Sequence, residues 1–421
     1  MRFFFNRLAE RLWVKPLIMC LLSIGAALLA RLADGLPAEW RLVEIAPGSL
    51  ETLLEVMAAS MLVIATFAVA SMVAAYSSAS STATPRSFPL VVADDVSQNA
   101  LSTFVGAFIF SIVALITFEN GYFQQAGIFV LFLLTVAVFA LVIMTFVRWV
   151  DRIARLGRIG STIQKAEAAC DDAIRQRRLA PNMGGLSAGR RTSPDSAVFA
   201  KSIGYVQRVD VAALQSIAEA SRVRIVVAAL PGTFAAPDRA LAYWVSDSES
   251  DVEASLDPAA ISEAFLIGNS RTFDEDPRFG LIVLAEIACR ALSPAVNDPG
   301  TAIDVIGSFV RLFVTWSRPL NDEERAAQNA PFDRVEVPEL SADDLFEDAF
   351  RAIARDGAGT IEVAVRMQKA LESIAFAGGA DVSRAAARHA RLALARAEAA
   401  LDSSEDIAQL REVAEFARAA R

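Results

Sequence analysis

Long apolar runs separated by short polar breaks dominate the first third of the chain. Crossing about 30 Å of hydrocarbon takes a helix of roughly 20 residues, and the runs 56–84, 96–118 and 127–147 reach that length without a charged residue. A fourth run has a shorter uncharged core between Lys15 and Arg31, whose long side chains can reach the membrane surfaces. A cleaved signal peptide is the alternative for this first run. We predict a membrane domain of residues 1–150 with four spans, at about 12–33, 53–75, 98–118 and 127–147.

The second apolar run is longer than a span requires. A helix over residues 50–84 would measure about 52 Å, and hydroxyl side chains fill nearly all of its end, "YSSASSTAT", before Pro85 stops it. This end is either a solvated helix terminus or the mouth of a pore. In the second interpretation the lining residues of the pore mouth are Ser77, Ser80, Ser81, Thr84 and Arg86.

The remaining residues predict a cytoplasmic part built from several modules. A juxtamembrane helix and linker occupy 151–197, and a small β module follows at 198–250, with "GYVQRVD", "VRIVVAAL" and "RALAYWVS" as strands around the helix "VAALQSIAEAS". This order resembles a small barrel or sandwich of the lipoyl type, without a lysine to carry a swinging cofactor. The predicted fold class is therefore a four-span α-helical membrane domain followed by a cytoplasmic α+β region, with a small β-barrel- or sandwich-like module and a helical C-terminal tail.

Three Asp-Pro pairs predict three helix starts in the segment 251–335. Aspartate is a favoured N-cap and proline suits the first helical position, so Asp257, Asp276 and Asp298 begin "AAISEAFLIG", "RFGLIVLAEIACRAL" and "GTAIDVIGSFVRLFVTW". After a charged, proline-containing loop, a helical tail covers 336–421. Its first helix begins at Ser341, with Asp344 three residues later as in a capping box.

Charge and composition indicate on which side of the membrane the two termini lie. The chain of 421 residues has 54% apolar residues and a formal net charge of −9, and its apolar excess lies in the first 150 residues. Lys and Arg cluster before the first span and after the last, which predicts that both termini are cytoplasmic. A globally acidic chain argues against a nucleic-acid partner, whereas the basic stretch beside the spans suits anionic lipid headgroups.

The cysteines and the single histidine of the chain argue against several kinds of catalytic and metal site. Cys20, Cys170 and Cys289 lie far apart, and His389 is the only histidine. We expect His389 on a helix surface and predict no cofactor, no metal and no catalytic residues. The runs 56–84, 96–118 and 127–147 contain no acidic or basic residue for a proton relay, which counts against a proton-coupled transporter. An enzyme is a third possibility, and would need Glu286, Asp298 and Asp304 to converge on a metal.

The stretch "SPAVNDPGT" has a complete structural explanation as a corner, because Ser293-Pro294 ends one helix and Asp298-Pro299 starts the next. It lacks the glycine-rich run and lysine of a phosphate-binding loop. Together with "SSASSTATPR" and "GYVQRVD", the segment "EDPRFGLIVLAEIACRALSPAVNDPGTA" resembles the bacterial predicted-membrane-protein family called domain of unknown function 2254, up to about residue 375. The residues that carry the joint and the family motif are Asp276, Pro277, Glu286, Arg290, Ser293, Pro294, Asn297, Asp298, Pro299 and Thr301.

Two functional hypotheses follow. The leading one is a homo-oligomeric, channel-like conduit for ions or small solutes with a cytoplasmic regulatory domain, because hydroxyl side chains can line a pore without intramembrane charges. The alternative is a membrane-anchored cytoplasmic binding or signalling protein without transport activity. The resemblance adds architecture and leaves the activity open.

Overall fold

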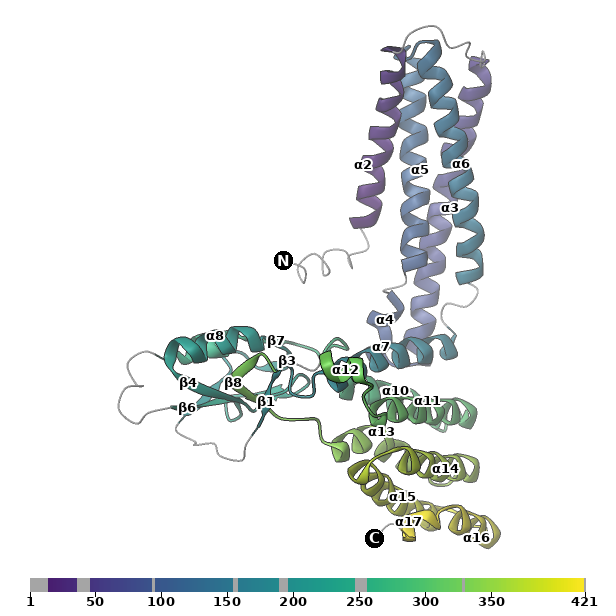
Figure 1. Ribbon diagram of the computed structural model, residues 1–421. Helices are drawn as coiled ribbons and strands as arrows, with labels where there is room; N and C mark the ends of the chain where they lie inside the picture. The colour runs from purple at the N-terminus through teal and green to yellow at the C-terminus, as the bar shows by residue number, and fades with distance from the viewer. Residues whose placement is uncertain are drawn as a thin grey trace. The chain divides into compact units, whose positions relative to one another are not determined.

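The structure, a computed structural model, describes residues 14–35, 46–92, 95–153, 158–188, 196–246, 256–327 and 330–419 (Figure 1). The chain divides into two compact units, an N-terminal unit of Met1–Thr162 and a C-terminal unit of Ile163–Arg421. The predicted basic positions Arg2, Arg7 and Arg11 lie outside the described residues.

Four long helices run side by side in the N-terminal unit (Figure 1). They are α2 (Val14–Leu29), α3 (Pro47–Thr82), α5 (Asp95–Glu119) and α6 (Gln125–Ile153), joined in part by η1 (Ala30–Gly35), η2 (Pro85–Ser87) and α4 (Phe88–Val92). Among the described residues, four segments are long and apolar enough to cross a membrane. The coarse prediction of a membrane domain with four such helices is thus confirmed.

Helix α5 lies at the centre of this bundle and contacts α2, α3 and α6. Its Phe104 and Phe110 are fully buried. Its buried hydroxyls are satisfied inside the helix, since Ser102 Oγ donates to the carbonyl of Gln98 at 2.7 Å and Ser111 Oγ to that of Ala107 at 2.9 Å. Such internal pairing is what an apolar medium requires of polar groups. The other three helices expose large apolar side chains, as lipid-facing surfaces do.

Helix α3 confirms the prediction of an overlong second helix. It has 36 residues, which corresponds to about 54 Å, well beyond the thickness of a hydrocarbon core. It ends at Thr82, and Thr84 is extended (φ −140°, ψ 146°) before Pro85. The residue before a proline is driven out of the helical region by contact with the ring.

A carboxylate from η1 closes the N-terminus of α6. Asp34 Oδ2 accepts from the backbone N–H of Gln124 at 2.9 Å, and Oδ1 accepts from that of Gly127 at 2.6 Å. The first N–H groups of a helix have no partner within the helix and carry partial positive charge. A Cβ at Gly127 would lie 2.7 Å from Asp34 Oδ2, so the close approach requires glycine.

The C-terminal unit begins with two β-sheets. The five-stranded sheet has the order β1 (Gly185–Ser187), β8 (Phe332–Val337), β4 (Val223–Val227), β6 (Ala240–Ser246) and β2 (Ala197–Phe199), in which β8 is parallel to both neighbours and the remaining pairs are antiparallel. The second sheet is antiparallel, with the order β5 (Phe234–Ala235), β3 (Gly204–Val209) and β7 (Phe265–Gly268).

Both sheets share one apolar core with the helices α8 (Val211–Ser221) and α9 (Pro258–Glu263). Val206 of β3, Ile225 of β4 and Val335 of β8 are fully buried in this core. The α+β prediction is confirmed at this level. The described strands form two open sheets and no closed barrel, so the barrel-like alternative is not confirmed.

Two strands differ from the prediction for their segments. The apolar stretch "AAISEAFLIG" predicts one helix, but α9 ends at Glu263 and the residues that follow pair with β3 as strand β7. The proline-flanked segment expected to be a charged loop contains α12 (Asp322–Ala327) and β8. Val335 and Val337 of β8 are buried between β1 and β4, so strand pairing and burial prevail over the charges that alternate with them.

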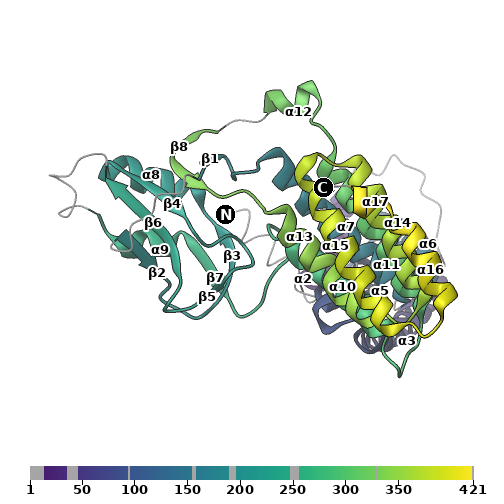
Figure 2. The same cartoon turned by 90° about the horizontal axis from the view of Figure 1, so that it is seen from below.

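The rest of the C-terminal unit is a stack of antiparallel helices, arranged in layers in Figures 1 and 2. They are α7 (Ile159–Leu179), α10 (Pro277–Ala291), α11 (Pro299–Ser317), α13 (Ala342–Asp356), α14 (Ile361–Ala377), α15 (Ala380–Ala400), α16 (Ser404–Val413) and α17 (Phe416–Ala419). The pair α10–α11 packs on α13–α14, which packs on α15 and α16. This is the packing mode of α-solenoids.

Asp-Pro pairs start α9, α10 and α11 as the sequence predicts. The carboxylate of each aspartate accepts from a backbone N–H of the first turn: Asp257 from Ala259, Asp276 from Phe279, and Asp298 from Thr301. Each cap fixes the residue at which its helix begins. The starting residue in turn determines which side chains of α10 and α11 face the rest of the stack.

The prediction of a surface position for His389 is wrong. His389 on α15 is 4% exposed, and its ring lies 5.8 Å from that of Phe346, centroid to centroid. Burial, followed by the charge of Arg388, lowers the pKa of His389 from 6.5 to about 4. Alanines surround His389 in the sequence, and their small side chains let α15 approach α13 and α14 closely enough to cover it.

We predict that Asp34→Ala destabilises the membrane bundle by about 1–2 kcal/mol, because loss of a cap leaves helix N–H groups without an acceptor. Thermal unfolding of the purified full chain in detergent measures this. Glu119→Ala is the matched control, since Glu119 is an exposed carboxylate at the end of α5. An equal loss in both variants would contradict the capping role.

We predict that acid destabilises the protein through His389. Below pH 6.5 the unfolded chain binds a proton at this imidazole that the folded chain does not bind until about pH 4, so the free energy of unfolding falls across that interval by up to about 3 kcal/mol. Glu347 and Asp343 oppose this shift, whereas Arg388 and Arg396 enlarge it. His389→Leu should flatten the pH dependence of thermal unfolding between pH 6.5 and 4, and an unchanged slope would refute the assignment.

Candidate functional site: a cavity at one end of the helical stack

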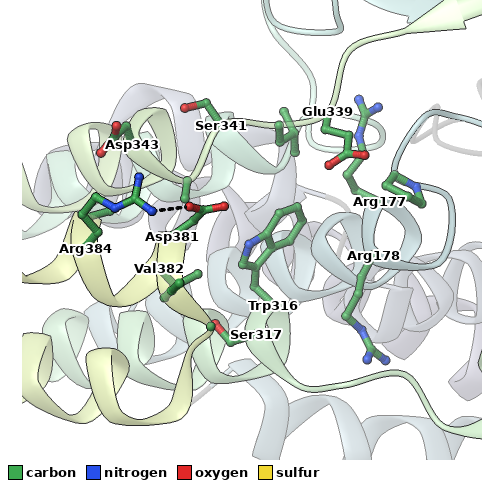
Figure 3. Close-up of a pocket in the computed structure, with 16 residues that line it drawn as sticks. Arg177, Arg178, Trp316, Ser317, Glu339, Ser341, Asp343, Asp381, Val382 and Arg384 are labelled. Carbon is green, nitrogen blue, oxygen red and sulfur yellow. Dashed lines mark hydrogen bonds and ion pairs between the residues drawn. The ribbon is translucent and has the colours of Figure 1, made fainter. Parts of the chain in front are cut away.

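The antiparallel stack brings several helix ends together around a cavity. Helices α7 and α11 end there, α13 begins there, and α14 turns into α15 beside them. The cavity has a volume of about 610 Å³ and is lined by both charged and apolar side chains. Figure 3 shows Trp316 in the middle of the lining, with Asp381 and Arg384 on one side of it and Arg177 and Glu339 on the other.

Arg177 is the most buried charged residue of the lining. It stands in the last turn of α7, where a cation is favoured by the helix dipole, and it is 5% exposed. Its Nη1 is buried and has no hydrogen-bond partner among the described residues. Burial lowers the pKa of Arg177, against the opposing charges of Glu275 and Asp276. The cavity wall therefore holds a guanidinium group with an unmet donor.

The two carboxylates near Arg177 make their ion pairs with other arginines, while Oε2 of Glu275 is buried without a hydrogen-bond partner among the described residues. Asp276 accepts two hydrogen bonds from Arg271, at 2.7 and 2.9 Å, and also caps α10. Glu275 lies 3.3 Å from Arg208, and burial raises its pKa. Neither carboxylate makes a salt bridge to Arg177 within the described structure.

Two helix N-termini border the cavity. Helix α13 is capped by Ser341, whose hydroxyl accepts from the N–H of Asp344 at 3.4 Å. Helix α15 begins after Gly379, which supplies no side-chain cap. A Cβ added at Gly379 would meet no atom within 4 Å, so this glycine leaves space in front of the first N–H groups of a helix of 21 residues.

Several other charges of the lining are paired within the protein. Arg384 donates to Asp381 at 2.9 Å, and Asp343 lies 3.0 Å from Arg388. Arg178 donates to Glu324 at 2.5 Å and to the carbonyl of Arg318 at 3.0 Å. Arg177 differs from these side chains because no salt bridge joins it to a carboxylate within the described structure.

The residues predicted for a pore mouth lie at the end of α3 and just after it. Ser77 and Arg86 are exposed, whereas Thr84 is buried and its hydroxyl accepts from the N–H of Arg86 at 3.4 Å. The side chains of Ser80 and Ser81 lie outside the described residues. In the described structure Thr84 therefore acts as a cap for η2.

The predicted joint residues form the corner between α10 and α11. Ser293 Oγ donates to the carbonyl of Arg290 at 2.7 Å, and the N–H of Asp298 donates to that of Ala291 at 2.8 Å. Asn297 takes a left-handed conformation, with φ 52°. Thr301 donates through both its hydroxyl and its N–H to Asp298, whose pKa these hydrogen bonds lower.

The joint lies far from the cavity. It precedes α11, whereas Trp316 lies near that helix's end, which places the two about 26 Å apart along its axis. Pro294 is exposed in the corner, and Pro277 and Pro299 open α10 and α11. Glu286 is half-buried on α10, and the described residues contain no cluster of His, Cys, Asp or Glu that could hold a metal ion.

Comparison with known proteins decides the family. The model of the family described as "Predicted membrane protein (DUF2254)" matches residues 9–373. The chain belongs to this family. The match confirms the resemblance seen in the sequence. It includes α7, α11 and α13 of the cavity, ends within α14 and does not reach α15.

Curated relatives in the family come from mycobacteria. Uncharacterized proteins of Mycobacterium bovis and Mycobacterium tuberculosis are 36% identical to the chain over 124 residues, which is 29% of this chain and 24% of theirs. The chain thus matches about a quarter of the length of these relatives. No solved structure matches the chain.

The residues of the cavity are not predicted by the sequence. Arg177 stands where helix gives way to a Gly/Ser/Pro-rich linker, and its burial depends on segments more than a hundred residues away. Two signals are nevertheless present in the sequence. The arginine pair "RR" ends an amphipathic helix just before Pro181, and "AGGAD" leaves the start of α15 without a capping side chain.

Proposed function

We propose that the protein is a membrane-anchored binding protein, whose C-terminal unit holds a small molecule in the cavity between α7, α11, α13 and α15. This function is the second of the two hypotheses that the sequence suggests, the first being a channel. The observation that carries it is the 610 Å³ cavity with the buried, incompletely paired Arg177 in its wall. Ligand sites in proteins are typically concavities of about 300–1,000 Å³ with a few convergent polar groups.

The proposal places the C-terminal unit in the cytoplasm of a bacterium, with the four apolar helices in the inner membrane. Lys15 lies at the start of the first span, Arg148 and Arg152 lie in the last turns of the fourth spanning helix, and Arg158 follows it. Short basic segments next to spans remain on the cytoplasmic side. A ligand would then come from the cytoplasm. The lipid bilayer would be the partner of the protein's four apolar helices.

The proposed activity is binding without catalysis. The cavity is lined by arginines, carboxylates, two serines, one tryptophan and small apolar residues, with no histidine or cysteine among its described lining residues. In the described structure no hydrogen bond joins the hydroxyl of Ser317 or Ser341 to a carboxylate of the lining, and nucleophilic catalysis needs a nucleophile paired with a base. Binding uses the same groups as hydrogen-bond partners.

We predict that Gly379→Leu abolishes ligand binding while leaving the fold intact. The new side chain meets no atom at its Cβ and projects into the space before α15. Thermal shift of the purified full chain against a panel of nucleotides, sugar phosphates, organic acids, amino acids and uncharged sugars measures binding. Gly359→Leu is the control, because Gly359 is exposed, lies outside the cavity, and its Cβ would contact only the Ala400 carbonyl at 3.7 Å.

The two glycine variants separate binding in the cavity from binding elsewhere on the protein. The proposal expects at least one compound to raise the unfolding temperature of the wild-type chain and of Gly359→Leu but not of Gly379→Leu. A panel without effect on the wild-type chain, or shifts that persist in Gly379→Leu, would count against the cavity as a ligand site.

A homo-oligomeric conduit for ions or small solutes remains the second candidate, and one surface favours it. Ala59, Thr66, Ala70 and Ser77 are exposed on α3, and their spacing of seven, four and seven residues puts them on one helix face. Small residues let membrane helices approach closely, so this face suits contact with other copies of α3 around an axis.

For the conduit, we predict that the purified protein conducts ions in planar bilayers and that Ser77→Trp blocks conduction by filling the mouth. Val69→Trp is the control, since Val69 is an exposed apolar residue of the same helix about 80° around the helix from that row. A bilayer that stays tight over a range of voltage, tension and salt, with a protein that is monomeric in detergent, would eliminate this candidate.

A further inference from the structure

We infer that Glu55 of α3 faces a water-filled passage between copies of the chain, where a ring of its carboxylates makes the passage select cations. The permeant is then an inorganic cation. This inference goes beyond binding in the cavity and rests on the second candidate function, the homo-oligomeric conduit, whose permeant class it specifies.

The first argument is the depth of Glu55 in the helical bundle. Its neighbour Leu54 belongs to a buried cluster with Ala114 of α5 and Leu131 of α6. Leu131 lies four residues inside the charge-free run 127–147, which is about 6 Å along the helix. Glu55 also lies inside the candidate membrane span Gly48–Ser78 of α3. The carboxylate therefore starts from a level at which the neighbouring helices carry only uncharged side chains.

The second argument is the direction of the Glu55 side chain. Leu54 and Met57 are buried against the bundle, whereas Glu55 is exposed. No described residue forms a hydrogen bond or an ion pair with the Glu55 carboxylate. Ionised side chains within spans are costly toward lipid and nearly always face a protein interior or a water-filled cavity. A second copy of the chain, packed against this face of α3, supplies both protein and enclosed water.

The third argument is the set of residues that share a helix face with Glu55. Ala59 and Thr66 follow it by four and eleven residues, which puts all three on the face that ends at Ser77. Thr66 satisfies its hydroxyl inside the helix by donating to the carbonyl of Val63 at 2.8 Å. An ionised carboxylate has no proton to donate to a carbonyl, so Glu55 is the group of this face that requires water or a cation.

The sign of the charge decides the permeant. In a cyclic oligomer each copy contributes one Glu55 at the same level around the axis. Carboxylates that face one another repel, cations relieve the repulsion, and rings of acidic side chains select cations in channels. Among the described residues at this end of the bundle the basic one is Arg31, whose guanidinium carbon lies 5.4 Å from the ring centre of Tyr122. The ring of carboxylates therefore sets the charge of the passage at this level.

Ion selectivity of the purified full chain in planar bilayers tests the inference, with potassium chloride at unequal concentrations on the two sides. We expect potassium to be roughly fivefold or more as permeant as chloride in the wild type, and Glu55→Gln to lower this ratio about threefold or more, because the charge of the ring is lost. Glu55→Asp keeps the charge and should keep the selectivity. Glu119→Gln is the matched control, since Glu119 is an exposed carboxylate at the end of α5.

Cross-linking in native membranes tests the contact between copies without reference to conduction. Glu55→Cys should give a covalent dimer with a short bis-maleimide. Val69→Cys is the matched control, because Val69 is exposed on another part of the α3 surface. The wild-type chain, with Cys20, Cys170 and Cys289, sets the background of the reaction.

The outcomes separate this inference from both candidate functions. A chain that conducts with the same selectivity in the wild type and in Glu55→Gln leaves the conduit in place and overturns the acidic ring. Glu55→Cys that cross-links no better than Val69→Cys also overturns it, because the carboxylate then reaches the headgroup surface on a single copy. A bilayer that stays tight overturns the inference together with the conduit, and leaves ligand binding in the cavity untouched.

Discussion

The antiparallel stacking of helices in the C-terminal unit is the constraint on which the candidate site depends. Helix α14 ends where α15 begins, and the chain that leaves α11 returns to the same face of the stack as α13 after passing through α12 and β8. Both of these places lie beside the end of α7. Helix ends carry unpaired backbone groups and partial charge. Their convergence makes that face of the stack polar, while aromatic side chains such as Phe313 and Phe346, 4.4 Å apart between ring centroids, fill its interior.

The polar groups at the two ends of the stack are satisfied to different extents. At the corner between α10 and α11, Asp298 and Thr301 satisfy the free backbone groups, and the chain closes on itself. At the opposite end, Arg177 is buried with an unpaired donor, and α15 starts without a side-chain cap. Buried polar groups in proteins are nearly always hydrogen-bonded, and Arg177 Nη1 is one of several buried polar atoms without a hydrogen-bond partner among the described residues. The corner stabilises the fold, and the cavity is where we propose that a ligand binds.

Local signals in the sequence account for much of the architecture. Charge-free runs predict the membrane helices because ionised groups are costly in hydrocarbon, and the Asp-Pro pairs predict helix starts because both residues act within one turn. The features that the sequence did not predict depend on contacts with segments far away in the chain. Strand β8 is fixed by pairing with β1 and β4, the burial of His389 by the close approach of α13, and the cavity around Arg177 by helices far away in the sequence. None of these leaves a periodic pattern in its own neighbourhood.

The most direct measurement is an experimental structure, by electron cryomicroscopy or crystallography, of the full chain with a compound that raises its unfolding temperature. The account predicts density for the compound in the cavity lined by Trp316 and Gly379. An empty cavity, or the compound bound at another surface, would contradict it.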